Sequence, residues 1–115
     1  MTAQAELTER IRQELADQSP VEEKPMFGVR AFMVGDKMVA CALKDGGLLV
    51  RIASDRHEEL LARPGAEQAV MGPKRRDMGP GWIEVSAEAI AGDELSEWIG
   101  LALAHNHAVR RAAAR

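Results

Sequence analysis

The residues of this 115-residue chain best suited to metal binding are three histidines, His57, His105 and His107. His105 and His107 are two positions apart, and such positions do not share a face of a helix, so this pair would not chelate one metal ion. Neither a second cysteine nor a run of carboxylates is present to complete a tetrahedral set of ligands. The sequence therefore predicts no metal site and no cofactor.

Two other arrangements have residue types that could carry out nucleophilic catalysis. Ser54, Asp55 and His57 have the side chains of a triad, but they fall within one helical turn, where helix capping explains them better. No Gly-x-Ser-x-Gly motif occurs in the chain. Cys41 shares strand parity with the apolar Val39, which predicts a small buried side chain rather than a nucleophile. We therefore expect no catalytic residues and no enzyme activity.

Basic side chains gather in two places, although 18 acidic residues outnumber 15 basic ones and the formal net charge is −3. One place is a loop bracketed by Gly-Pro pairs, and the other is a C-terminal tail that we expect to be flexible from about residue 108. Such clusters could neutralise phosphates, but aromatic residues make up only 3% of the chain, so stacking partners for bases are scarce. Accessory nucleic-acid binding remains an alternative, with the candidate contacts Lys74, Arg75, Arg76, Arg110 and Arg111.

The segment from Lys24 to Gly28 is the most unusual candidate for a contact surface. Its Met-Phe pair precedes a glycine beside basic residues, and such pairs either enter a core or form adaptable contact surfaces. Trp82 has the opposite strand parity to Ile83, which places it on the less buried face of a sheet. The candidate interaction surface comprises Lys24, Met26, Phe27, Gly28, Arg30, Arg51 and Trp82, and a small-molecule pocket near Met26, Phe27 and Arg51 is a further alternative.

Hydrophobic periodicity predicts the elements that position these residues. Leu7, Ile11 and Leu15 recur at every fourth position, which predicts a helix over about residues 3–18. The turn signals Gly35-Asp36 and Asp45-Gly46-Gly47 separate apolar runs, which predicts a meander of three antiparallel strands. Those runs cover residues 30–34, 37–43 and 48–53.

The second half of the chain also contains both helices and strands. The expected elements are a short helix at 54–62, a weak strand near 67–71, a strand at 82–86 and a final helix after Asp93. The final helix carries an apolar stripe made of Leu95, Trp98, Ile99, Ala102 and Leu103. The order α-β-β-β-α-β-β-α with short connections predicts a two-layer α+β fold, in which helices pack on an antiparallel sheet of about five strands.

Length and composition place the whole chain in one globular domain. The composition is 46% hydrophobic and 29% charged, which is typical of a folded domain rather than a disordered chain. No apolar run is long enough to span a membrane, and the acidic N-terminal segment is unlike a signal peptide. With one cysteine and no internal disulfide, we expect a cytoplasmic protein.

Three stretches together resemble the TfoX N-terminal domain family, the TfoX/Sxy-like proteins. They are Met26-Phe27-Gly28-Val29-Arg30-Ala31-Phe32-Met33, Gly35-Asp36-Lys37-Met38 and Leu48-Leu49-Val50-Arg51. The Gly81-Trp82 strand and the helix with Leu95 and Trp98 are also similar to that family, and the likeness covers about residues 5–107. The family typically reads Met-Phe-Gly-Gly, whereas Val29 stands here in place of the second glycine.

The resemblance implies a bacterial α+β domain that has no catalytic residues. Longer relatives add a C-terminal helical domain and regulate competence genes, and this chain ends before such a domain, so we do not expect the regulatory role to carry over whole. We expect a non-enzymatic interaction or regulatory module whose partner is another protein or a second copy of itself in a homodimer.

Overall fold

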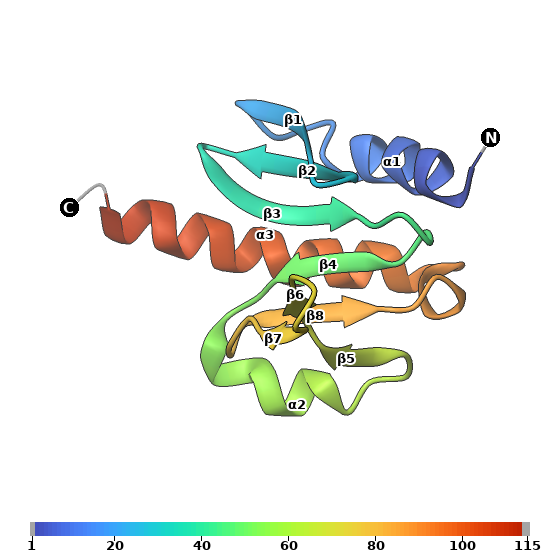
Figure 1. Cartoon of the computed structure of the whole chain (residues 1–115). Coiled ribbons are helices and arrows are strands. Elements are labelled where there is room, and N and C mark those ends of the chain that lie inside the picture. Colours follow the sequence, from blue (N-terminus) through green and yellow to red (C-terminus); the bar gives the residue numbers. More distant parts are fainter. Residues whose placement is uncertain (1, 114–115) are drawn as a thin grey trace.

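The computed structural model describes residues 2–113 and shows a six-stranded sheet with helices packed on it (Figure 1). The helices are α1 (Ala3–Glu14), α2 (His57–Leu61) and α3 (Glu94–Ala113), with 3₁₀ turns at Ser54–Arg56 and Glu88–Ile90. The strands of the sheet are β1 (Val21–Met26), β2 (Val29–Val34), β3 (Lys37–Ala42), β4 (Leu48–Arg51), β5 (Ala66–Gln68) and β8 (Trp82–Val85). A separate hairpin pairs β6 (Val70–Met71) with β7 (Arg76–Asp77). The predicted α+β class is confirmed.

The sheet has the strand order β1-β2-β3-β4-β8-β5, and every neighbouring pair is antiparallel. The first four strands form a meander, as the turn signals predict for three of them. β8 then pairs with β4, although α2, β5 and the β6–β7 hairpin lie between them in the sequence. This order leaves β1 and β5 as the two edges of the sheet.

Helices α1 and α3 pack on one face of the sheet, and the main core lies between these helices and the sheet. The stripe Leu7, Ile11 and Leu15 is fully buried there, as predicted. From α3 the core takes Leu95, Trp98, Ile99 and Ala102, and from the sheet it takes Phe32, Val34, Val50, Ile83 and Val85, among others. The core is thus formed by helix residues that recur at every third or fourth position and by strand residues that recur at every second position.

The opposite face carries a smaller apolar cluster of different composition. Its buried members are Ala31, Cys41, Leu49 and Ala69, and its partly buried members include Met26, Met38, Leu43, Met78 and Trp82. Cys41 is buried, as predicted, but it does not share a face with Val39. The pairing of β2 with β3 shifts at Phe32/Met33, and this irregularity reverses the side-chain alternation before Cys41.

The largest differences from the sequence predictions concern the end of the first helix, the strand β1 and the C-terminal segment. α1 ends at Glu14 rather than near residue 18, because Leu15 already leaves the helical conformation and turn-forming residues follow it. β1 was not predicted, because its sequence shows no apolar alternation and contains Pro25, which is tolerated in an edge strand. α3 continues through Ala113, so residues 108–113 are helical where the sequence predicts a flexible tail. Residues 114–115, including Arg115, lie outside the described residues.

Candidate interaction surface

The β1–β2 hairpin carries most of the predicted contact residues, and its turn is strained. Met26 pairs with Val29, so Phe27 and Gly28 alone form the turn, with φ values of 52° and 81°. Two-residue turns with positive φ at both positions fit the twist of a hairpin, and residues such as Asn and Gly normally occupy them. A bulky phenylalanine at positive φ is an outlier, and Phe27 is 96% exposed, so packing does not compensate for this conformation.

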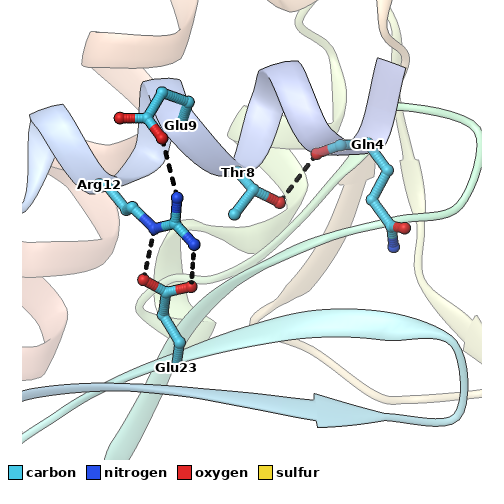
Figure 2. Close-up of polar contacts among 5 residues, drawn as sticks. All are labelled: Gln4, Thr8, Glu9, Arg12 and Glu23. Carbon is cyan, nitrogen blue, oxygen red and sulfur yellow. Dashed lines mark hydrogen bonds and ion pairs between the residues drawn. The ribbon is translucent and has the colours of Figure 1, made fainter. Parts of the chain in front are cut away.

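Helix α1 fastens this turn to the rest of the domain. The Gln4 side-chain amide donates to the carbonyl oxygen of Gly28 at 2.9 Å and to that of Ala42 at 3.0 Å. Thr8 Oγ1 donates to the Gln4 carbonyl one helical turn away (Figure 2). The turn is therefore held in place through its glycine, while the phenylalanine side chain has no packing role.

A second contact with α1 holds the middle of β1. The Arg12 guanidinium donates through Nε and Nη2 to both carboxylate oxygens of Glu23, at 2.6 and 2.9 Å, and through Nη1 to Glu9 (Figure 2). The bond from Arg12 lowers the pKa of Glu23 below its ordinary value of 4.5. No sequence pattern pointed to Gln4, Arg12 or Glu23, because their contacts depend on how α1 lies across the hairpin.

The surroundings of Phe27 are basic. The Lys44 side chain passes over Gly28, at the position that a Cβ would need. Lys24 lies three residues before Phe27 on β1 and forms a loose pair with Glu22 at 3.7 Å. Arg30 follows on β2, and within residues 2–113 neither Arg30 nor Lys44 forms an ion pair. Lys44 at the turn and Arg30 at the start of β2 thus add positive charge on either side of the exposed ring, and neither forms an ion pair in this part of the chain.

The structure divides the seven predicted surface residues into two groups. Residues 24–30 lie on the hairpin, where Met26 packs against the smaller apolar cluster. Arg51 and Trp82 are opposite each other on β4 and β8, separated from β1 by two strands. The Arg51 guanidinium carbon lies 4.7 Å from the centre of the Trp82 ring. Trp82 is half-buried on the face away from α1 and α3, as its parity predicts.

The basic residues considered for nucleic-acid binding do not form one surface. Lys74 and Arg75 are exposed in the β6–β7 turn, and Arg76 follows on β7. Arg110 and Arg111 lie at the C-terminal end of α3, well away from that hairpin (Figure 1). The Arg110 side chain packs over Gly35 in the β2–β3 turn. The two clusters therefore act, at most, as separate small basic patches.

Both ring nitrogens of His57 form hydrogen bonds within the fold. Its Nδ1 accepts from the Gly81 N–H at 2.9 Å, so its Nε2 carries the proton donated to Gln68 Oε1 at 2.7 Å. Gln68 in turn donates to the carbonyl of Gly79.

Ser54 begins a 3₁₀ turn without a side-chain capping bond, so the predicted capping role of Ser54 is wrong. The backbone there starts from an extended Ala53, not from a serine cap.

The described residues also settle where Cys41 lies and whether a metal-binding group is present. Burial raises the pKa of the Cys41 thiol to about 11, which keeps the sulfur protonated. Residues 2–113 contain no group of three or more His, Cys, Asp or Glu side chains arranged to hold a metal ion. In the same span, no helix combines the length and apolar character needed to cross a membrane.

These features define a class of protein: a small α+β domain with an antiparallel six-stranded sheet, helices on one face and a β-hairpin at one edge. A family model described as the TfoX N-terminal domain matches residues 13–106, and the chain belongs to that family. The matched region runs from the last two residues of α1 through most of α3 and includes the β1–β2 hairpin. No curated protein and no solved structure gives a significant match.

Proposed function

We propose that this domain is a non-enzymatic interaction module that binds a protein partner through the tip of the β1–β2 hairpin. The observation that carries the proposal is Phe27, which is 96% exposed and has a φ of 52°. Strained backbone positions persist where they serve a function, and an exposed side chain contributes nothing to the core. A single aromatic anchor at such a tip is typical of residues that dominate binding energy.

The charges around Phe27 indicate the chemistry of the partner. Arg30 and Lys44 form no ion pair within residues 2–113, although the charge of Arg30 also acts on Glu23, and Lys24 is only loosely paired. An apolar pocket with acidic residues around it would accept the ring and complement these cations. Added salt should therefore slow association with this partner.

The non-enzymatic part of the proposal is supported by the state of the two most reactive side chains. Both ring nitrogens of His57 are bound within the fold, and the Cys41 thiol is buried. A regulatory role of the competence type, which the family resemblance implies, would act through the same hairpin contact. The single cysteine favours a cytoplasmic setting for this contact.

Homodimer formation, in which the partner is a second copy of the chain, stays a prediction. Pairing of two β1 edges would extend the sheet, but Pro25 and the charged Glu22, Glu23 and Lys24 discourage such pairing. We therefore favour a different protein as the partner, and self-association is one outcome that the experiment detects.

The test replaces the aromatic ring without disturbing the turn. In Phe27→Asn, asparagine accepts positive φ more easily than phenylalanine, so the hairpin is retained. Wild type, Phe27→Asn and the control Met71→Gln are used to capture proteins from the native lysate. Met71 is 58% exposed on the separate β6–β7 hairpin, so its substitution removes exposed apolar surface elsewhere.

A captured protein supports the proposal only after a direct measurement. Its contact segment should be acidic and apolar, should bind wild type and Met71→Gln equally, and should bind Phe27→Asn at least tenfold more weakly, by an order-of-magnitude estimate. Equal binding of Phe27→Asn and wild type overturns the proposal. Light scattering of the pure domain at high concentration shows whether the partner is a second copy.

A further inference from the structure

A pocket of about 300 Å³ lies at the end of the sheet opposite to the β1–β2 turn. It is formed where the β2–β3 turn, the end of β4, the start of β8 and the C-terminal half of α3 meet. Its lining residues are Asp36, Lys37, Met38, Arg51, Trp82, His105, Asn106 and Val109. This volume is at the lower end of the range for small-molecule sites.

Arg51 presents hydrogen-bond donors to this pocket. Its guanidinium carbon lies over the Trp82 ring, 4.7 Å from the ring centre, and this cation–π contact restrains the group. Within residues 2–113, Arg51 makes no side-chain hydrogen bond and no ion pair that would occupy its N–H groups. A planar guanidinium held in one orientation is suited to a bidentate contact with a carboxylate.

Asn106 provides the second, independent observation. Its side chain is 3% exposed, and its Nδ2 donates to the Val34 carbonyl at 3.0 Å, which fixes the orientation of the amide. Its Oδ1 is buried without a hydrogen-bond partner in the described chain. Buried polar atoms almost always have a partner, and Asn106 lines the pocket, so Oδ1 is an acceptor that a donor on a bound ligand would satisfy.

The charges of the lining residues limit what can enter. Arg51, Lys37 and Asp36 all line the pocket, which sets two cations against one carboxylate. Burial, with a smaller effect from Arg51, lowers the pKa of His105 and favours its neutral form. A surplus of one positive charge suits a monoanion better than a doubly charged phosphate. Met38 and Val109 add an apolar wall.

We propose that this pocket binds a small organic monocarboxylate that carries a hydroxyl or amide N–H donor and a short apolar tail. The carboxylate pairs with Arg51, the donor satisfies Asn106 Oδ1, and the tail packs against Met38 and Val109. This site is separate from the hairpin tip, so it can fail without affecting the proposed protein contact.

Three matched probes test each part of the ligand. The probes are 2-hydroxy-4-methylpentanoate, 4-methylpentanoate without the hydroxyl, and 2-hydroxy-4-methylpentanamide without the charge. NMR of the ¹⁵N-labelled domain is informative because the chain has two tryptophans, so two indole N–H signals are expected. Trp82 lines the pocket, whereas Trp98 is 2% exposed in the main core and serves as an internal reference.

The hydroxy acid should shift the Trp82 indole signal and leave that of Trp98 in place. We expect 4-methylpentanoate to bind about tenfold more weakly because Asn106 Oδ1 stays unpaired, and the amide to bind at least as poorly because it lacks the charge. The proposal is overturned if no probe shifts the Trp82 signal at up to about 10 mM. It is also overturned if the acids with and without the hydroxyl bind equally, since water then satisfies Oδ1.

Two arginine variants complete the test. Arg51→Gln should weaken binding of the hydroxy acid about tenfold or more, since the charge-assisted hydrogen bonds are lost. Arg63→Gln is the matched control, because Arg63 also stacks on a tryptophan, Trp98, at 5.5 Å but does not line the pocket. Equal loss of affinity in both variants would contradict the assignment of Arg51.

Discussion

The two turns that flank β2 have similar backbones and opposite residue chemistry. In the β2–β3 turn, Gly35 and Asp36 have φ values of 58° and 67°, which glycine and aspartate adopt readily. In the β1–β2 turn, Phe27 and Gly28 have φ values of 52° and 81°, and phenylalanine is among the residues least suited to its position. The β2–β3 turn thus uses residues that favour positive φ, whereas the β1–β2 turn reaches the same geometry with a phenylalanine that disfavours it.

The difference indicates that the β2–β3 turn stabilises the fold and that the conformation of Phe27 in the β1–β2 turn does not. Gly35 is packed under the Arg110 side chain, and its N–H donates to the Pro20 carbonyl at 3.1 Å. Phe27 has no comparable contact and is almost wholly exposed. Local rules are often broken at functional positions, and the contrast therefore supports the proposal that the first turn binds a partner.

The largest effect is expected in the turn that serves the fold. Gly35→Val places a branched side chain at positive φ and against Arg110, so it should reduce the free energy of unfolding by about 3 kcal/mol. Denaturant unfolding followed by circular dichroism measures this change. A loss below about 0.5 kcal/mol would show that the turn does not need glycine.

Removing the anchor of the other turn should have an intermediate effect. Gln4→Ala deletes the hydrogen bonds to the carbonyls of Gly28 and Ala42, so it should lower stability by about 1–2 kcal/mol. Hydrogen exchange should speed up in the β1–β2 hairpin more than in α3. Gln13→Ala, at an exposed position of the same helix, is the control and should change little.

Exchanging the residue types of the two turns tests the comparison directly. Phe27→Asn should raise the free energy of unfolding by about 0.5–1 kcal/mol because asparagine fits the turn. Asp36→Phe should lower it by about 1 kcal/mol, because an aromatic side chain then occupies positive φ in the second turn. If Phe27→Asn destabilises the domain, Phe27 has a packing role and the contrast fails.

The smallest effect concerns the ion pair that fastens β1 to α1. Arg12 lowers the pKa of Glu23 in the folded state, so the pair stabilises the domain above the ordinary carboxyl pKa. This stability is lost as the pH falls through the lowered pKa. Glu23→Gln should therefore be slightly less stable than wild type at neutral pH, and the two unfolding curves should converge in acid. A difference that is independent of pH would contradict this role.

The sequence predicted features that depend on neighbours along the chain. The stripe on α3, the Gly35-Asp36 turn and the opposite faces of Ile83 and Trp82 are set by periodicity or turn chemistry, and the structure confirms them. β1 escaped prediction because Val21–Met26 lacks alternation and because Phe27 is an unusual turn residue.

The sites themselves depend on contacts between distant elements. The sequence named Phe27, Arg51 and Trp82 as parts of one surface, whereas the structure places Arg51 and Trp82 on β4 and β8, away from the hairpin. The sequence contained no signal for Asn106. The buried Oδ1 of Asn106 arises only because α3 crosses the end of the sheet beside Val34. Likewise, the bond between His57 and Gly81 joins positions 24 residues apart, which no local pattern reveals.

The central claim is that Phe27 is a binding residue held in a turn that would be more stable without it. The most direct measurement is the affinity of the captured partner segment for wild type and Phe27→Asn, made on samples whose unfolding free energies are measured in parallel. We predict binding weakened at least tenfold, by an order-of-magnitude estimate, in a variant that is more stable than wild type. Unchanged affinity in Phe27→Asn would contradict the account.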